Sequence, residues 1–295
     1  MPSGNIVLAT TTDALLLGVQ STFVDAYNTA GAMEHPLLKD CMDMGLPTDG
    51  LYESYAYPEK VPYPTQWRRG NSVPSGAFKF KGWSVTNYDY GRKVPWNRND
   101  QADDRTKSLM STVSSLGSNW ATLNERFFFE VLTGTSTILP AIPTCPDGAA
   151  LFSTTDGDSA DRFGVTDGNI VSGGGVTTGA LIRIDVWKAY ARFVSMLDTQ
   201  SQPLWNPTFL AQGVVVIHSP ALMEVMAEAF DQSITSAVVS TSNAGVSNTL
   251  IGNKIPVQRW CSPRLSGNDF YIFAKGAPHK AIFEQTRQAL TIQLF

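Results

Sequence analysis

Hydrophobic residues recur at helical spacing in three long segments of the chain. Over residues 103–132 they follow steps of four, three, four, three, four and four, which places them on one face of an α-helix. The same spacing predicts amphipathic helices over residues 13–30 and 177–198. We expect the apolar seam of the longest helix to be core, with Trp120 as its deepest anchor at a point where Gly117 lets a neighbour approach closely. The seam residues are Leu109, Val113, Leu116, Trp120, Leu123, Phe127 and Val131.

Short apolar runs between glycine, proline and polar residues predict strands in the second half of the chain. The run GVVVIHSP indicates a short buried strand, and ALMEVMAEAF after it indicates a helix. A strand, a polar tip and another strand are expected over residues 236–260, and two more strands in DFYIFAKG and ALTIQLF. Because helices and strands follow no regular alternation and no internal repeat is present, we predict an α+β fold.

Residues 51–98 differ in kind from the segments on either side. They hold five prolines and four glycines, with alternating stretches such as AFKFKGWSV between them. A loop of this length without structure is improbable inside a compact domain. We therefore predict an extended, two-stranded β-hairpin that packs on something else.

Charge is distributed unevenly between this hairpin and the segment before it. Residues 58–98 contain eight basic and two acidic residues, a net charge of +6, whereas residues 1–57 contain one Lys and seven acids, a net charge of −6. The two segments can each be a solvated surface, or they can be complementary surfaces with net charges of equal size and opposite sign. The aromatic and basic hairpin would also suit single-stranded nucleic acid, but the net charge of −4 of the whole chain opposes that function.

The composition indicates a globular protein with a sizeable core, since 43% of its residues are hydrophobic and 16% are charged. The three cysteines, Cys41, Cys145 and Cys261, are far apart and form no CxxC pair, so we expect reduced thiols. No basic residue precedes the first apolar stretch, and no apolar run is long enough to cross a membrane. We expect neither a signal peptide nor a transmembrane helix.

Residues that carry chemistry are scattered. His35, His218 and His279 are isolated in sequence, and there is no HExxH motif or Cys/His cluster, so no metal site is expected. His218 ends the predicted buried strand, where a hydrogen-bonded structural role is expected.

Two polar segments carry weak signals of ligand binding. Residues 173–175 are three glycines without the Gly-Lys-Ser/Thr that a phosphate loop needs, which favours a connector. The acidic loop over residues 156–167 lacks the spacing and closing Glu of an EF-hand, which favours a solvated loop. We predict no catalytic, cofactor-binding or metal-binding residues, and no enzyme.

Several short motifs are specific in combination. They are the basic hairpin before the helix ending NERFFFEVL, then DGAALFS, PLWNP, GVVVIHSP, GNKIPV and DFYIFAKG. In this order they resemble the major head subunit family of Mu-like prophages, which has the Hong Kong 97 capsid fold. The resemblance runs from about residue 10 to the last residues.

The resemblance implies a major capsid protein that self-assembles into the icosahedral head shell of a tailed phage. A shell subunit needs protruding segments that lie on its neighbours, and the hairpin fits that need. The implied divisions are an N-terminal arm at 1–48, an extended loop at 49–100, a peripheral domain with a spine helix at 101–164, an axial domain at 165–260 and return strands of the peripheral domain at 261–295.

The implied partners are other copies in hexamers and pentamers, separate scaffold, portal and cement proteins, and packaged double-stranded DNA without sequence-specific contacts, but no membrane. The protein would assemble in the host cytoplasm and reside in the virion. The alternatives are an encapsulin-like nanocompartment shell and a hydrolase with an unrecognised active site. The candidates for contacts between subunits are Arg68, Arg69, Phe78, Lys79, Phe80, Lys81, Trp83, Arg92 and Lys93.

Overall fold

A computed structural model gives the conformation of most of the chain, which divides into two units that we describe separately. The first unit comprises residues 1–53, 85–130 and 280–295, and the second comprises residues 54–84 and 131–279. The structure describes residues 7–8, 14–60, 66–67, 69, 72–73, 79–94, 108–146, 148–153, 169–171, 173–197, 211–231, 234–236, 245–247, 256–277, 280–288 and 290–292.

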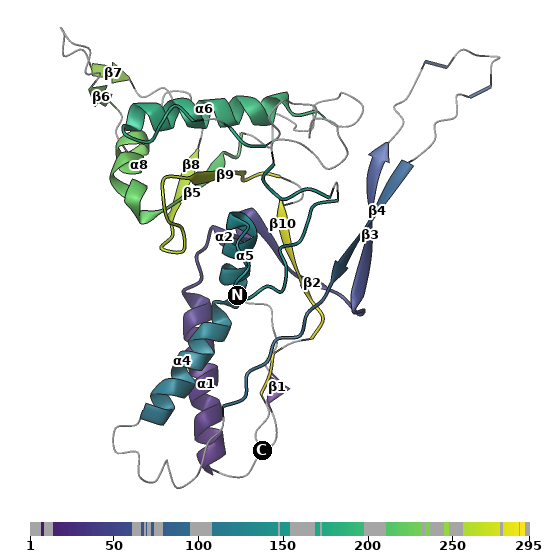
Figure 1. Cartoon of the computed structure of the whole chain (residues 1–295), viewed down its shortest axis with the longest axis vertical. Coiled ribbons are helices and arrows are strands. Elements are labelled where there is room, and N and C mark those ends of the chain that lie inside the picture. Colours follow the sequence, from purple (N-terminus) through teal and green to yellow (C-terminus); the bar gives the residue numbers. More distant parts are fainter. Residues whose placement is uncertain are drawn as a thin grey trace. The chain divides into compact units, whose positions relative to one another are not determined.

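In the first unit, helices α1 (Ala14–Ala32) and α4 (Ser108–Ala121) lie side by side and enclose a hydrophobic core (Figure 1). The helix expected over residues 13–30 is thereby confirmed. Its buried side chains recur every fourth residue, as one face of a helix requires. The buried members of the core are Val19, Phe23, Tyr27, Val113 and Ala121.

Short parallel strand pairs complete the first unit. After α2 (Leu38–Cys41), strand β2 (Met42–Pro47) pairs with β10 (Ile282–Thr286), so that Met42 lies opposite Ile282. Strand β1 (Val7–Leu8) pairs with β11 (Thr291–Ile292). Of these strands, only β11 falls in a segment for which the sequence predicted a strand.

The long helix expected over residues 103–132 is interrupted. Helix α4 ends at Ala121 and α5 (Leu123–Thr133) begins after Thr122, whose hydroxyl donates to the backbone carbonyls of Ser118 and Asn119, each at 3.3 Å. Such bonds compete with the helical backbone ladder and commonly bend a helix. Residues 103–107 lie outside the described part of the chain.

The interruption changes which residues of the seam are core. Val113 is buried as expected, the side chain of Leu109 lies outside the described residues, and the remaining seam residues are only partly buried. Beyond Thr122 the buried hydrophobic side chains are Phe128, Phe129 and Leu132, one or two residues further along than the expected Phe127 and Val131. The expectation that Trp120 is the deepest anchor is wrong, because Phe128 is 0% exposed and Trp120 lies at the edge of its core.

The second unit is built around a three-stranded sheet with a central buried strand. Strand β5 (Val214–His218) has all five residues buried, which confirms the strand expected in GVVVIHSP. It pairs in parallel with β8 (Val257–Cys261) and antiparallel with β9 (Phe270–Ala274). Gly213 directly precedes the strand with a φ of +92°, and a Cβ there would overlap the carbonyl of Pro256.

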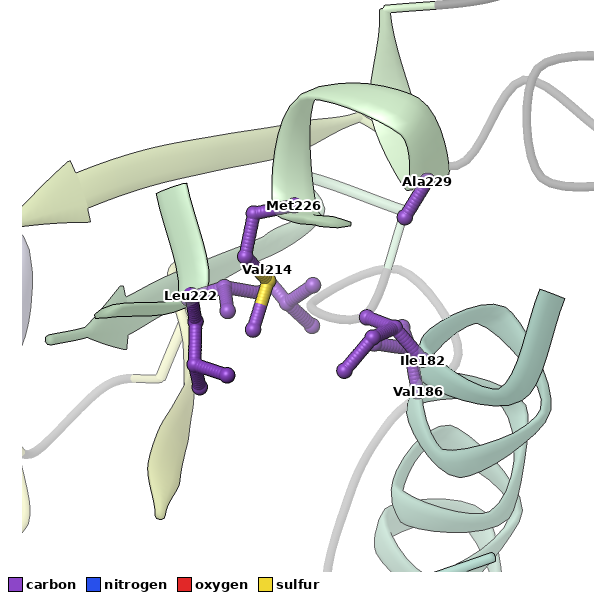
Figure 2. Close-up of a cluster of buried hydrophobic side chains, with 7 residues drawn as sticks. Ile182, Val186, Val214, Leu222, Met226 and Ala229 are labelled. Atoms are coloured by element: carbon purple, nitrogen blue, oxygen red, sulfur yellow. The ribbon is translucent and has the colours of Figure 1, made fainter. Parts of the chain in front are cut away.

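Two helices cover this sheet, and both confirm helices expected from the sequence. Helix α6 (Gly179–Ser195) begins at the N-cap Thr178, whose hydroxyl accepts from the Leu181 N–H. Helix α8 (Met223–Phe230) follows the short 3-10 helix η2 (Pro220–Leu222). Figure 2 shows their side chains meeting over β5. The buried members of this core are Ile182, Val186, Val214, Val216, Leu222, Met226 and Ala229.

The structure has two further pairs of strands. Strand β3 (Tyr52–Lys60) pairs with β4 (Lys79–Thr86), which confirms the two-stranded hairpin expected within residues 51–98. Strand β6 (Ile234–Ser236) pairs antiparallel with β7 (Gly245–Ser247). The helix and strand content is mixed, as an α+β fold requires.

The strands after residue 260 do not all return to the first unit. Strand β9 hydrogen-bonds with β5 of the second unit. Of the described strands after residue 262, β10 and β11 pair with strands of the first unit. The sequence of β9 is apolar throughout and does not specify a partner, so its pairing could not be predicted from the pattern alone.

Candidate assembly surface

The hairpin of β3 and β4 carries an aromatic pair across its two strands. Tyr55 of β3 and Trp83 of β4 have ring centroids 5.8 Å apart and tilted by 41°. Cross-strand aromatic pairs of this kind each contribute roughly 0.2–1 kcal/mol to a sheet. Since an isolated two-stranded hairpin is marginally stable in water, this contact helps to hold its register.

A single asparagine fastens the base of the hairpin, within the first unit. The Asn87 backbone N–H donates to the Leu51 carbonyl at 2.9 Å, and its side-chain amide donates to the Gly50 carbonyl at 2.7 Å and the Thr48 hydroxyl at 3.3 Å. Thr48 in turn donates from its hydroxyl to Glu53 at 3.1 Å. Together these bonds tie the chain entering β3 to the chain leaving β4.

Gly50 is required in this arrangement for a steric reason. An added Cβ would lie 2.8 Å from the carbonyl oxygen of Tyr52, which is closer than real Cβ atoms approach backbone. The sequence reasoning identified neither Asn87 nor Gly50 as functional. The available signal was a turn residue at each end of the alternating stretch, namely the Asp-Gly before β3 and the Asn directly after β4.

The chain beyond the hairpin is fixed to helix α5 by a second aromatic pair. Tyr90 and Phe127 have ring centroids 5.0 Å apart, both within the first unit. Phe127 is only partly buried, although it lies on the expected seam. Tyr90 and Asn87 together anchor the segment that follows β4.

Large apolar side chains are exposed along the hairpin and at its base. Apolar groups on this scale in one segment are costly to hydrate and commonly mark a surface that another molecule covers. The exposed residues of this segment are Leu51, Tyr52, Trp67, Val73, Tyr88 and Val94.

The comparisons with known proteins place the chain in a family. Residues 84–291 match the model of the phage capsid protein family. The chain belongs to that family. No curated protein sequence matches it.

Solved structures of phage shells resemble this capsid protein. The subunit in the structure of the bacteriophage JBD30 capsid is 15% identical, with a TM-score of 0.52 over 88% of this chain and 100% of that one, which shows a shared fold. A second match is to the JBD30 procapsid computed in I4 symmetry, with 18% identity and a TM-score of 0.33. That match covers 55% of this chain and spans half the length of the procapsid subunit.

The structure describes only some of the residues that we expect to contact other subunits. Arg69, Arg92 and Lys93 are exposed, and Trp83 is partly buried beside Tyr55. Lys79, Phe80 and Lys81 lie on β4, with side chains outside the described residues, and Arg68 and Phe78 lie outside them altogether.

The histidine and cysteine side chains of the capsid protein have structural surroundings. His218 is buried, its Nδ1 lies 2.8 Å from the Ser219 carbonyl, and burial lowers its pKa, so the neutral ring donates from Nδ1. The three cysteines are free thiols, and burial raises the pKa of Cys41 to about 12. His279 lies outside the described residues.

The glycine connector before α6 binds a side chain of its own chain. The Gly174 N–H donates to both carboxylate oxygens of the buried Asp185, at 2.8 and 3.0 Å. Lys188 approaches the same carboxylate at 3.3 Å. The Gly174 N–H is therefore engaged by a side chain of the same chain, as expected for a structural connector and not for a phosphate-binding loop.

Neither a metal-binding cluster nor a membrane-spanning helix occurs among the described residues. In the part of the chain that the structure describes, no group of three or more His, Cys, Asp or Glu side chains could hold a metal ion. The acidic loop over residues 156–167 lies outside that part. Among the described helices, none has both the length and the apolar character needed to span a membrane.

A group of partly buried carboxylates lies in the first unit. Burial raises the pKa of Glu34, and Glu125 raises it further while Lys39 lowers it. Burial likewise raises the pKa of Glu284, and Glu34 adds to that shift. One oxygen of Glu34 is buried and has no hydrogen-bond partner among the described residues. Burial also raises the pKa of Tyr27, with Glu284 and Glu34 adding to the shift. These side chains therefore hold their protons more tightly than the same groups do in water.

Proposed function

We propose that this capsid protein is the major head subunit of a tailed phage of the Mu-like type, with the Hong Kong 97 fold. Copies would close an icosahedral shell as hexamers and pentamers. The observation that supports this most directly is the β3–β4 hairpin, fastened at its base by Asn87 and lined with exposed apolar groups, in a chain of the phage capsid family. Such a segment gains stability when it lies on another subunit.

The proposed divisions follow the fold of such subunits. Residues 1–48 would be the N-terminal arm and residues 49–100 the extended loop. Residues 101–164 would carry the spine, here divided into α4 and α5. Residues 165–260 would form the axial domain, and residues 261–295 the return strands, with β9 left in the sheet of β5.

The proposed partners follow from a shell that encloses a genome. The subunit would require a separate scaffold protein, a portal and cement proteins, and would contact double-stranded DNA without reading its sequence. Assembly would take place in the host cytoplasm. We also infer that the chain has no catalytic activity, as is usual for a shell-building family. The family does not favour a nanocompartment shell or a hydrolase.

Charge supports a specific contact between neighbouring subunits. The hairpin segment carries a net charge of +6 and residues 1–57 carry −6. We propose that the basic hairpin docks on acidic surface of the adjacent copy. Individual exposed ion pairs contribute only about 0–1 kcal/mol, so the contact would be collective and weakened by salt.

The test is assembly of the purified protein and of a charge-reversed variant. Electron microscopy should show shells, rings or tubes for the native chain. Changing Arg68, Arg69, Lys79 and Lys81 to Glu should abolish them and leave the circular dichroism of the subunit unchanged. A control with Arg264→Glu and Arg287→Glu, outside the hairpin, should assemble. A native chain that stays monomeric at all concentrations and salts would overturn the proposed function, and normal assembly of the hairpin variant would overturn the docking contact.

A further inference from the structure

Helix α6 is apolar on the side that faces away from its own core. Its inward side places Ile182, Asp185 and Val186 in the interior of the second unit. Its outward side is a stripe with spacings of four, four, three, three and one, which a helix of 3.6 residues per turn places on one face. We name these residues the α6 stripe: Ala180, Ile184, Lys188, Ala191, Val194 and Ser195, all of them exposed.

The composition of the α6 stripe is unusual for a surface in contact with water. Ile184 is 50% exposed and Val194 is 53% exposed, and two alanines lie beside them. The stripe's one charged side chain, Lys188, leans back to the buried Asp185 at 3.3 Å. A helix that is apolar on both sides is typical of one that is covered on both sides. The alanines would let a partner approach its backbone closely.

A second exposed surface of the same unit has the matching character. The start of α8 and the 3-10 helix before it expose Pro220, Ala221, Met223 and Glu224, which we name the α8 edge. Met223 is 61% exposed. The α8 edge is apolar with one acidic group, whereas the α6 stripe is apolar with one basic group. The two surfaces therefore match in apolar character, and the exposed Lys188, which also contacts Asp185, can face the acidic Glu224.

The two surfaces belong to elements that approach one core from different sides. Figure 2 shows Ile182 and Val186 reaching the cluster from α6, and Met226 and Ala229 reaching it from α8. Inside the unit the two helices meet closely at Gly179, where an added Cβ would lie 2.7 Å from the Ala229 backbone nitrogen. The α6 stripe and the α8 edge are the exposed parts of these two elements, outside the shared core.

We propose that the α6 stripe of one copy packs against the α8 edge of the next copy, with Ile184 and Val194 beside Met223 and Lys188 near Glu224. This contact is heterologous, because it joins two different surfaces, and heterologous contacts repeat around an axis to close a ring. It rests on the proposed function, since it requires a chain that assembles with itself. It uses no residue of the hairpin.

Cross-linking between two singly substituted chains tests the contact. Cys145→Ser and Cys261→Ser provide the background, and the remaining Cys41 is buried. Ile184→Cys and Met223→Cys are introduced on separate chains, which are co-expressed, assembled and treated with a flexible bis-maleimide. Linked dimers are expected in the mixed assemblies and not in assemblies of either variant alone.

A pair of charge insertions gives an independent readout. Ile184→Asp should abolish rings and shells, while Ile170→Asp, the same change at an exposed position outside α6, should leave assembly intact. Both variants should keep the circular dichroism of the native subunit. Normal assembly of Ile184→Asp, mixed shells without linked dimers, or linked dimers in the Ile184→Cys assembly alone would each overturn this contact and leave the proposed function standing. Failure of the native chain to assemble would overturn both.

Discussion

Gly117 of α4 lies so close to Phe23 of α1 that a Cβ on the glycine would be 2.5 Å from the phenylalanine carbonyl oxygen. The same Cβ would lie 3.1 Å from the Cβ of Ala26 and 3.2 Å from the Tyr27 nitrogen. Backbone therefore meets backbone at this crossing, and the helix pair at the centre of the first unit depends on the missing side chain.

Gly117→Ala should destabilise the subunit for this reason. Helix propensity alone favours alanine by about 1 kcal/mol, but forcing a methyl group into a packed contact typically costs about 1–3 kcal/mol. The denaturant midpoint of the unassembled subunit should fall. Gly18→Ala on α1 is the matched control, because no atom lies within 4 Å of its added Cβ, and its midpoint should stay the same or rise. Equal shifts in the two variants would contradict the close crossing.

Phe128→Ala should destabilise the subunit more than Trp120→Ala. Phe128 is fully buried and packs edge-to-face on Phe129, with ring centroids 5.3 Å apart, whereas Trp120 is partly buried. Truncation of a fully buried aromatic typically costs about 3–5 kcal/mol. Chemical denaturation of both variants gives the comparison. A larger loss of stability in Trp120→Ala than in Phe128→Ala would contradict this expectation and support the helix seam that the sequence predicted.

Asn87→Ala should loosen the base of the hairpin. The variant loses the side-chain hydrogen bonds to the Gly50 carbonyl and the Thr48 hydroxyl, each worth about 0.5–1.5 kcal/mol. Amide hydrogen exchange over residues 48–53 should become faster. Asn87→Asp should behave in the same way although it keeps the shape, because a carboxylate cannot donate to a carbonyl. Unchanged exchange in both variants would show that the backbone bond from Asn87 to Leu51 suffices.

Glu34→Gln should stabilise the subunit near neutral pH. Burial raises the pKa of Glu34 in the folded state above its ordinary value of 4.5, so the fold binds the proton more tightly than the unfolded chain does. The contribution of such an acid is fully present below pH 4.5 and is lost as pH rises through the folded pKa. Thermal midpoints of the variant and the native subunit should therefore converge at about pH 4 and diverge at pH 7. Equal thermal midpoints of the variant and the native subunit at pH 7 would contradict this expectation.

The sequence predicted the elements that have a strong local pattern. Val19, Phe23 and Tyr27 are spaced four residues apart, which predicted α1, and the unbroken apolar run of β5 predicted a buried strand. Gly117 was also recognised as a point of close approach. Each of these signals lies within about twenty residues of sequence, where period and burial are linked directly.

The parts that were missed depend on distant or competing interactions. The pairing of β2 with β10 joins Met42 to Ile282, and nothing local in either strand reports its partner. At Thr122 the hydroxyl and the backbone N–H both donate to the Ser118 carbonyl, and a hydrophobic pattern does not report such a local side-chain bond. Asn87 holds the base of the hairpin through individual hydrogen bonds to Gly50 and Thr48, and a sequence pattern does not report such bonds.

The pairing of Val7 with Thr291 has a consequence for the order of events during synthesis. The first unit draws on residues 1–53, 85–130 and 280–295, so a nascent chain can bring α1 and α4 together well before β10 and β11 leave the ribosome. Contacts this remote in sequence form late, because a long loop must be closed first. Until translation has passed residue 292, the growing polypeptide would expose the edge of β2 and the part of the core against which Leu290 and Ile292 pack. A finished surface becomes available for joining a shell only once this segment has been made.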